Sequence, residues 1–446
     1  MISIKEPILS VGLIKSPSIN LELYGDFRIR SVNYNFSGKY TAYIETGKIK
    51  LIGADFSQTF DGLILEPRDP LSETFLLKDV SIGINFHWQQ KKSFRFHGAL
   101  KLIICENEIM GINLVPLESY LTSVISSEMS ASSSLELLKA HAIISRSWVI
   151  AQLRSKKQKK EKSKTEFITD DEIIRWYDRS DHDLYDFCGD DHCQRYQGIT
   201  KKYSDRAVTA VEETRGVVLT FRNEICDTRY SKCCGGISES FDNVWQPEKH
   251  EYLSSVIDYK FEPENFNLSL SDEQAAINWI NGNPSAFCNT KDDKILSQIL
   301  VDYDRETHNF FRWSVQYTQE ELKNIIKTKS GIDFGEIRNL IPIERGVSGR
   351  LTKLRIVGTQ KELTIGKELE IRRVLSETHL YSSAFYVEMK DISEGIPGTF
   401  IFHGAGWGHG VGLCQIGAAV MGEMGYMFDE ILLHYFKNAR IERVYK

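Results

Sequence analysis

The sequence predicts an α+β fold, with an N-terminal β-rich region at residues 1–107 followed by a mixed helix and strand core at residues 108–446. Up to Cys105, runs such as LELYGDFRIRSVNY and SFRFHGALKLIIC alternate apolar and polar residues between turn residues, which is typical of short strands. After Pro116 the apolar residues recur with helical spacing instead. A chain of 446 residues is long enough for about two or three domains.

Two helices are expected at the start of the core. Pro116 is a favourable first-turn residue, and the apolar face that follows it ends near Glu128. A second helix is expected from Ser133, which has capping-box spacing to Glu136. The basic run SKKQKKEKSK at its end contains no aromatic residues, so we interpret it as a surface loop rather than a nucleic-acid patch.

The rest of the chain alternates between helix and strand patterns. Residues Tyr203 to Phe221 predict a helix and then a strand beyond Gly216, and FFRWSVQYTQEELKNIIKTKSG predicts a strand and then a helix. The segments GRLTKLRIVG and KELTIGKELEIRRVL predict strands. The chain is expected to end with the helix FDEILLHYF and the short strand RIERVYK.

Composition excludes several classes of protein. The net charge of −6 gives no global basic excess, which argues against nucleic acid as a partner. No run approaches the roughly 18 apolar residues of a transmembrane segment, and the start MISIKEPILSVGL has no signal-peptide pattern. The eight cysteines do not have the spacing of a small disulfide scaffold, so they leave the compartment open.

Glu128 is the first residue that could carry chemistry. A carboxylate at the junction of two helices can be partly desolvated, which would raise its pKa and let it act as an acid near neutral pH. From spacing alone, an exposed helix-terminal glutamate is the favoured alternative. On the second helix, His141 and Arg146 are residue types that more often serve packing or the surface than catalysis.

A metal site is expected in the segment DHDLYDFCGDDHCQRYQG. His182, Cys188, His192 and Cys193 are two imidazoles and two thiols within a dozen residues, which is the donor set of a closed structural zinc site. The spacing is not that of a common zinc finger. A disulfide between Cys188 and Cys193 ranks second, and ordinary loop residues are the remaining interpretation.

Two glycine-containing stretches, RYSKCCGGISES and HGAGWGHGVGLCQIGA, predict backbone that lines a cleft. In the second stretch His409 and Gln415 are candidate hydrogen-bonding groups. A phosphate loop is disfavoured because no Lys-Ser or Lys-Thr pair follows the glycines. Cys414 is only a weak candidate nucleophile, since nothing in the sequence ties a base to it.

Four ordered motifs resemble the stage II sporulation protein D family, also called SpoIID/LytB. They are VPLESYLTSVISSEMSASSSLELLKAHAIISRSW, CGDDHCQRYQG, CCGGISESFDNVW and GAGWGHGVGLCQIGA. The resemblance runs from about Ile109 to the end of the chain, with inserted segments near residues 156–169 and 249–341. The chain departs from the usual family residues at Ser130, His141 and Cys414.

The resemblance implies a peptidoglycan lytic transglycosylase in which Glu128 is the acid and then the base. It also implies a structural zinc on His182, Cys188, His192 and Cys193, with no organic cofactor. The candidate substrate-binding residues are Arg146, Gly408, His409, Gly410 and Gln415, where the glycines would admit the sugar chain.

The implied substrate is the glycan strand of peptidoglycan, which places the protein in the extracytoplasmic cell envelope. A cell-wall amidase is a candidate partner, because some relatives were named as enhancers of such an enzyme. The alternative function is therefore a non-catalytic peptidoglycan-binding module. A hydrolase that acts through the zinc is disfavoured, since two thiolates and two imidazoles would fill the metal shell.

Overall fold

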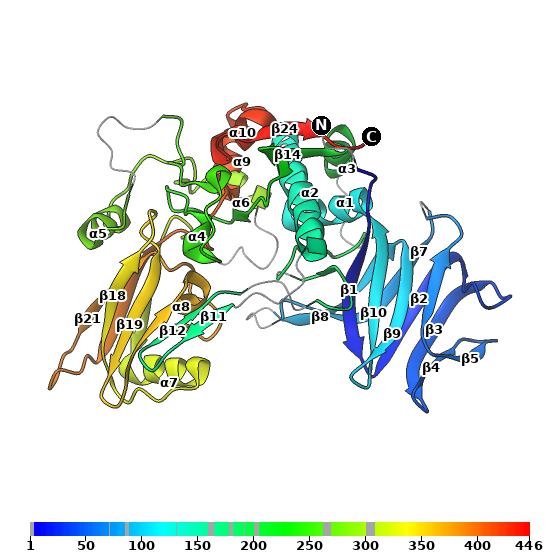
Figure 1. Ribbon diagram of the computed structural model, residues 1–446, viewed down its shortest axis with the longest axis horizontal. Coiled ribbons are helices and arrows are strands. Elements are labelled where there is room, and N and C mark those ends of the chain that lie inside the picture. The colour runs from blue at the N-terminus through cyan, green and yellow to red at the C-terminus, as the bar shows by residue number, and fades with distance from the viewer. Residues whose placement is uncertain are drawn as a thin grey trace.

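A computed structural model gives the fold of the chain (Figure 1) and confirms the predicted α+β class. The structure describes residues 4–70, 72–84, 89–130, 132–158, 165–177, 182–190, 192–199, 205–261, 269–299 and 308–446.

The N-terminal region is a large, mostly antiparallel sheet. Its strands are β1 (Ile8–Ser16), β2 (Ser18–Arg28), β3 (Phe36–Glu45), β4 (Lys48–Ile52), β5 (Ser57–Phe60), β6 (Leu63–Pro67), β7 (Thr74–Ile82), β8 (Gln90–His97), β9 (Ala99–Cys105) and β10 (Glu108–Pro116). Along most of the sheet the order is β1-β10-β9-β6-β2-β3-β4-β5. At its edge, β13 (Phe187–Cys188) pairs in parallel with β1, so the sheet also anchors the segment that carries the predicted zinc donors.

A group of helices lies at one end of this sheet. They are α1 (Leu117–Glu128), α2 (Leu135–Gln158), α3 (Asp205–Glu213), α9 (Gln415–Glu423) and α10 (Phe428–Tyr435). The helix α1 contacts β1 and β10, and the other helices pack around α1 and α2. A small sheet of β14 (Val217–Phe221), β15 (Glu224–Ile225) and β24 (Arg440–Arg443) completes this part. One hydrophobic core runs through all of these elements, from Leu9 on β1 to Tyr445 after β24. The two helices predicted after Pro116, and the helix and strand predicted at the end of the chain, are thus confirmed.

The start of α2 differs by one residue from the predicted cap. Ser134 Oγ accepts the backbone N–H of Leu137 over 3.2 Å, whereas Ser133 donates its hydroxyl to the carbonyl of Gln298 over 2.9 Å. Ser133 is thus used in a contact with a segment far away in the sequence. The helix extends to Gln158, into the basic run predicted as a loop, and residues 159–164 of that run lie outside the described part.

A second hydrophobic core lies in a separate group of elements (Figure 1). One sheet contains β11 (Glu166–Ile168), β12 (Glu172–Arg175), β18 (Ile337–Arg345), β19 (Leu351–Gly358) and β20 (Glu362–Gly366), and the other contains β17 (Arg312–Thr318), β21 (Phe385–Lys390) and β22 (Thr399–Ala405). The helices α7 (Gln319–Ser330) and α8 (Glu368–Val374) pack with these sheets.

The helix α8 corrects the prediction that all of KELTIGKELEIRRVL is strand. The first half is β20, but the chain then forms a helix in which Ile371 and Val374, three residues apart, are both buried. Over seven residues, ELEIRRV fits a period of two and a period of 3.6 almost equally well. Packing against β19 and β20 selects the helix.

Short elements connect the two cores. They are β16 (Tyr230–Ser231), α4 (Phe241–Val244), a 3₁₀ turn (Glu251–Leu253), α5 (Glu273–Asn281), α6 (Asp293–Ile299) and β23 (Leu413–Cys414). In the described residues no helix has the length and apolar character that a bilayer span requires.

Candidate active site

Glu128 is the last residue of α1, at the corner where the chain turns toward α2. Its side chain is half-buried. The backbone N–H of Arg195 donates to Glu128 Oε1 over 3.2 Å, and the Tyr230 hydroxyl donates to the same oxygen over 3.5 Å. Two donors on one oxygen restrict the rotation of the carboxylate, so this glutamate has a defined orientation rather than the freedom of an exposed helix end.

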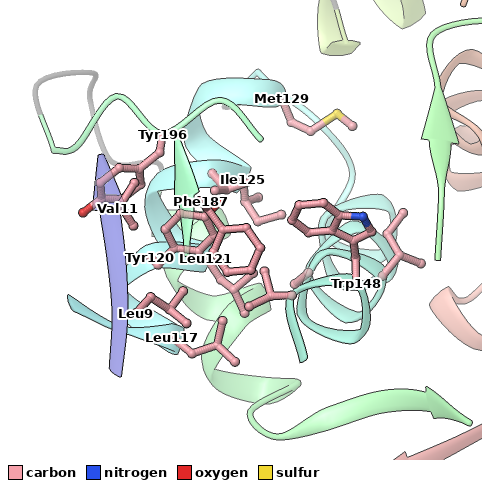
Figure 2. Packing of buried hydrophobic residues seen from close by; sticks show 14 of the residues in the cluster. Leu9, Val11, Leu117, Tyr120, Leu121, Ile125, Met129, Trp148, Phe187 and Tyr196 are labelled. Atoms are coloured by element: carbon pink, nitrogen blue, oxygen red, sulfur yellow. The ribbon is translucent and has the colours of Figure 1, made fainter. Parts of the chain in front are cut away.

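Aromatic packing holds α1 against the segment that supplies Arg195. Figure 2 shows Tyr120 and Ile125 of α1 directed toward Phe187, with Trp148 of α2 on the other side. The Tyr120 ring lies 4.9 Å from the ring of Tyr196 and 6.4 Å from that of Phe187, measured between centroids. Because these rings are buried in the main core, the end of α1 and the backbone near Arg195 keep a fixed spacing.

His141 lies on α2 beside the same corner and is completely buried. Its Nε2 lies 3.5 Å from Nε2 of Gln415, and its Nδ1 lies 3.4 Å from Oγ of Ser145. An amide nitrogen can only donate, so His141 Nε2 is the acceptor and the ring proton is on Nδ1. Burial lowers the pKa of His141 to about 4, against a raising effect of Glu128, and the imidazole is therefore neutral at pH 7.

The two glycine-containing stretches meet in space. The strands β16 and β23 pair in parallel, with Tyr230 opposite Leu413 and Ser231 opposite Cys414. Tyr230 thus comes from the first stretch, and its ring lies 4.7 Å from that of His141. The second stretch continues into α9, where Gln415 contacts His141 from the other side.

The glycines of the second stretch serve close contacts within the protein. A Cβ on Gly410 would lie 2.4 Å from Cζ of Arg350, and a Cβ on Gly412 would lie 2.1 Å from the carbonyl oxygen of Arg229. Both have positive φ angles, at +76° and +74°, which also favour glycine. Gly408 (φ +92°) is half-buried, with the Cβ of Ser231 3.1 Å from where its own Cβ would be. The packing of Arg350 and of the 229–231 backbone therefore explains most of this glycine pattern.

The remaining candidate substrate-binding residues differ in their exposure to solvent. His409 is half-buried, with its Nδ1 accepting the backbone N–H of Val411 over 3.0 Å and its ring 4.9 Å from that of Trp245. Gln415 is only 3% exposed, and Gly410 is buried as well. Of this group, His409 and Gly408 are the two that reach solvent.

Arg146 lies on α2 and is completely buried. Its Nε donates to Glu118 Oε1 over 2.9 Å, its Nη2 to Glu118 Oε2 over 2.6 Å, and its Nη1 to the carbonyl of Val217 over 3.0 Å. This two-pronged ion pair joins α1, α2 and β14 inside the core. A guanidinium held in this way has no surface to offer a sugar, which contradicts the expectation that it binds substrate.

The four predicted zinc donors lie together. One ligand atom each from His182, Cys188, His192 and Cys193 falls within 4.8 Å of the other three, which is close enough for one metal ion. The Sγ of Cys193 is 3.5 Å from Nε2 of His182 and 3.6 Å from Nδ1 of His192. Contacts with Cys193, His182 and His192 hold the pKa of the Cys188 thiol well below its usual range, and no disulfide joins Cys188 to Cys193.

The donor loop leads directly to the corner at Glu128. Arg195, whose N–H binds the carboxylate, is two residues beyond Cys193. Between them, Gln194 accepts a hydrogen bond from the Tyr120 hydroxyl over 3.3 Å. The conformation of the donor loop therefore sets the position of one of the two groups that orient Glu128.

A second donor group escaped the sequence reasoning. Cys234, Asp258, Cys288 and Cys414 also place one ligand atom each within 4.8 Å of the others, and all four are buried, so this group too could hold a metal ion. Tyr230 and the Arg195 N–H were missed as well. None of these residues belongs to a short motif with a recognisable spacing. In the sequence, the adjacent cysteines at positions 233 and 234 are the one feature that pointed toward the second group.

Comparisons with known proteins support the first two of the four ordered motifs, which lie within residues 105–221. Residues 105–221 match the family model described as stage II sporulation protein (SpoIID), and residues 239–412 match a domain of unknown function, DUF8618. The chain is 23% identical over 412 residues to an uncharacterized protein of Brachyspira hyodysenteriae, covering 91% of this chain and 88% of the relative.

Two further relatives carry functional names. Stage II sporulation protein D of Bacillus amyloliquefaciens is 22% identical over 330 residues, covering 73% of this chain and 74% of the relative. A Bacillus subtilis protein named amidase enhancer is 24% identical over 328 residues, covering 72% of this chain and 40% of the relative. Residues 105–221 therefore carry the match to the SpoIID family model, and the chain as a whole is distantly similar to proteins named stage II sporulation protein D and amidase enhancer.

Proposed function

We propose that this protein is a peptidoglycan lytic transglycosylase in which Glu128 is the general acid and then the general base. The observation that carries the proposal is the placement of Glu128, a half-buried carboxylate held by the Arg195 N–H and the Tyr230 hydroxyl at the corner between α1 and α2. A general acid must be held within reach of the oxygen that it protonates, and this corner supplies such a group. The substrate would be the glycan strand of the extracytoplasmic cell wall.

The reaction needs a single carboxylate. Protonated Glu128 gives its proton to the glycosidic oxygen between N-acetylmuramic acid and N-acetylglucosamine, and the C1–O bond of the muramoyl sugar breaks. The carboxylate so formed then removes the proton of the C6 hydroxyl of the same sugar, whose oxygen bonds to C1. The products are a 1,6-anhydro end and a free N-acetylglucosamine end, and no water is consumed, because the nucleophile belongs to the substrate.

The neighbours of Glu128 act on its orientation. The Arg195 N–H and the Tyr230 hydroxyl both bind Oε1, which leaves the direction of Oε2 fixed as well. His141 stays neutral and packs its ring against Tyr230. Gln415, which is buried against His141, then becomes a positioning residue rather than a direct ligand of the sugar.

A zinc ion would be held by His182, Cys188, His192 and Cys193. Four protein donors of these types make a closed shell, in which the metal stabilises a loop and does not activate water. In this protein the stabilised loop is the one that presents the Arg195 N–H to Glu128. A zinc hydrolase remains disfavoured for the same reason, since the donor set has no place for a catalytic water.

Contacts with the glycan are proposed at His409 and Gly408, which reach the surface of the second glycine-containing stretch. The His409 ring is held by Val411 and Trp245, so it would offer a pre-oriented polar edge to a sugar hydroxyl. For Arg146 and Gly410 we propose structural roles, because their surroundings are filled by protein.

The test is mass spectrometry of the products from wild type and Glu128→Gln, incubated with intact and with peptide-free peptidoglycan. Wild type is expected to give anhydro-muramoyl ends. Loss of a general acid and base usually costs about 10²–10⁴ in rate, and Glu128→Gln should lie at the upper end because one group serves both steps. Glu212→Gln is the matched control, since Glu212 is an exposed glutamate in the last turn of α3.

The alternative function is a non-catalytic peptidoglycan-binding module that enhances a cell-wall amidase. The similarity to the protein named amidase enhancer is the observation that favours it. If neither substrate yields products with wild type, while the protein still sediments with peptidoglycan, the transglycosylase is excluded and the binding module stands. Equal activity of Glu128→Gln and wild type would remove Glu128 from the mechanism.

A further inference from the structure

The donor group of Cys234, Asp258, Cys288 and Cys414 lies outside the proposed reaction. Cys234 follows β16, and Cys414 ends β23, so these two come from the paired glycine-containing stretches. Asp258 and Cys288 come from the segment between the 3₁₀ turn and α6. All four are at most 3% exposed. The group therefore joins two parts of the chain that are distant in sequence.

The spacing of the sulfur atoms is that of ligands that share an ion. The Sγ atoms of Cys234 and Cys288 are 3.6 Å apart. Two thiolates on a tetrahedral zinc, with Zn–S bonds of about 2.3 Å, would be separated by about 3.8 Å. A disulfide requires about 2.05 Å. The separation thus fits the edge of a zinc tetrahedron, and the other donor atoms complete a group no wider than 4.8 Å.

Further hydrogen bonds orient these donors. Asp258 Oδ1 accepts the Tyr435 hydroxyl over 2.5 Å, and Oδ2 accepts the backbone N–H of Cys288 over 2.9 Å. The Sγ of Cys414 accepts the N–H of Cys234 over 3.2 Å. Metal-bound carboxylates and thiolates are commonly held in this way by surrounding donors. A Cβ on Gly417 would come within 2.4 Å of Asp258 Oδ1, so the carboxylate lies in a space that glycine keeps open.

The charges around the group favour a cation inside it. Asp258 is completely buried, and in the described part of the chain no lysine, arginine or histidine forms an ion pair with it. A buried carboxylate without a cationic partner is costly even when it accepts hydrogen bonds, and a divalent ion would supply that positive charge. Arg312, held by carbonyl groups that include Gly235, interacts electrostatically with Cys234 and Cys288, so its positive charge would offset part of the excess negative charge that three thiolates and a carboxylate leave around a divalent ion.

We propose that Cys234, Asp258, Cys288 and Cys414 bind one zinc ion in a closed structural site. Thiolates are soft ligands that favour zinc over magnesium or calcium, and three thiolates with one carboxylate complete a four-coordinate shell. The fourth thiol of this region, Cys233, is buried beside the group but is not one of the four donors. The ion pins the parts of the chain around Asp258 and Cys288 onto the strand pair β16–β23, next to Gln415 and the Glu128 corner.

The test is the zinc content of the full-length chain, measured by inductively coupled plasma mass spectrometry after purification with a thiol reductant. Wild type should contain two zinc ions per chain. Asp258→Asn and Cys288→Ser should each lose one, and Cys188→Ser should lose the other. Cys226→Ser is the control, because Cys226 is a buried thiol outside both donor groups and should keep both ions.

A second measurement guards against variants that fail to fold. In Cys188→Ser only the proposed site retains zinc, and X-ray absorption of that zinc should show three sulfur neighbours at about 2.3 Å and one oxygen. A wild type whose only zinc is lost in Cys188→Ser would overturn the proposal. Iron in place of zinc, or a Cys234–Cys288 disulfide found by peptide mass spectrometry of unreduced protein, would do the same.

Discussion

The two donor groups of this protein have similar chemistry but opposite origins. His182 and Cys193 are eleven residues apart and belong to one loop, whereas Cys234 and Cys414 are 180 residues apart. In the first group His192 is exposed and the other three donors are half-buried, while the second group is wholly buried. The comparison teaches that spacing in a sequence finds a site built by one loop, and that a site assembled by the tertiary fold leaves almost no such trace.

The two donor groups also stabilise different parts of the molecule. The group of His182, Cys188, His192 and Cys193, here called the loop group, ends two residues before Arg195 and so acts on the orientation of Glu128. The buried group joins the parts of the chain around Asp258 and Cys288 to the strand pair β16–β23. Between them lies the buried contact of His141 with Gln415, the residue that follows Cys414. Changes to the loop group should therefore affect catalysis most, and changes to the buried group should affect the fold.

The largest difference is expected in the release of metal. A chelator such as EDTA should remove one zinc ion from native protein, because the loop group is open to solvent at His192. The second ion should remain until the protein unfolds, since its donors are buried. Zinc released to a colorimetric indicator, followed over time with and without denaturant, measures this. Release of both ions at one rate would break the comparison.

A substitution at His141 tests the region between the two groups. The pKa of His141 is about 4 in the folded protein, against 6.5 for the free side chain, so the unfolded chain binds the proton more readily between these values. The free energy of unfolding of wild type should therefore fall as the pH drops from 6.5 to 4, by about 3 kcal/mol from this residue alone. Above pH 6.5 the contribution is complete.

His141→Gln should remove that dependence, because an amide does not titrate in this range and can still contact Gln415. Urea unfolding at several pH values gives the free energy of unfolding of wild type and of His141→Gln as a function of pH. The difference between these two curves reports on His141, because the effects of the other titratable groups cancel. Curves that stay parallel from pH 7 to pH 4.5 would show that His141 is protonated as easily in the folded chain as in the unfolded one.

The smallest of these effects is expected for Cys188→Ser on the rate of glycan cleavage. Loss of a supporting interaction around a site typically costs about 10- to 100-fold, and here the loop that presents the Arg195 N–H would loosen without loss of Glu128 itself. The rate of anhydro-muramoyl release at saturating substrate is the measurement. Cys105→Ser is the matched control, since Cys105 is a half-buried thiol outside both groups. An unaltered rate in zinc-depleted Cys188→Ser would separate the loop group from catalysis.

Local patterns predicted the parts of the structure that are built from neighbouring residues. The helix ending at Glu128 follows from a continuous apolar face after Pro116, and the grouping of His182, Cys188, His192 and Cys193 follows from four donors in a dozen residues. Such features need no knowledge of the rest of the fold. The corner at Glu128 was therefore accessible from the sequence, although its two hydrogen-bond donors were not.

The errors came from partners that are distant in the sequence. Arg146 was assigned to substrate, but Glu118, 28 residues earlier, captures it inside the core. Gly410 was assigned to a sugar, but Arg350 occupies the space beside it. A segment as short as ELEIRRV is ambiguous by period, and only its packing decides that α8 forms. In each case a tertiary contact determined the outcome.

The most direct test of the proposed function is cleavage of peptidoglycan in water enriched in ¹⁸O, with mass spectrometry of the new muramoyl ends. Glu128 is proposed to transfer protons only between groups of the substrate, so the anhydro ends released by wild type should contain no ¹⁸O. Muramoyl ends that carry one ¹⁸O atom at C1 would mean that water is the nucleophile, and would contradict the transglycosylase account.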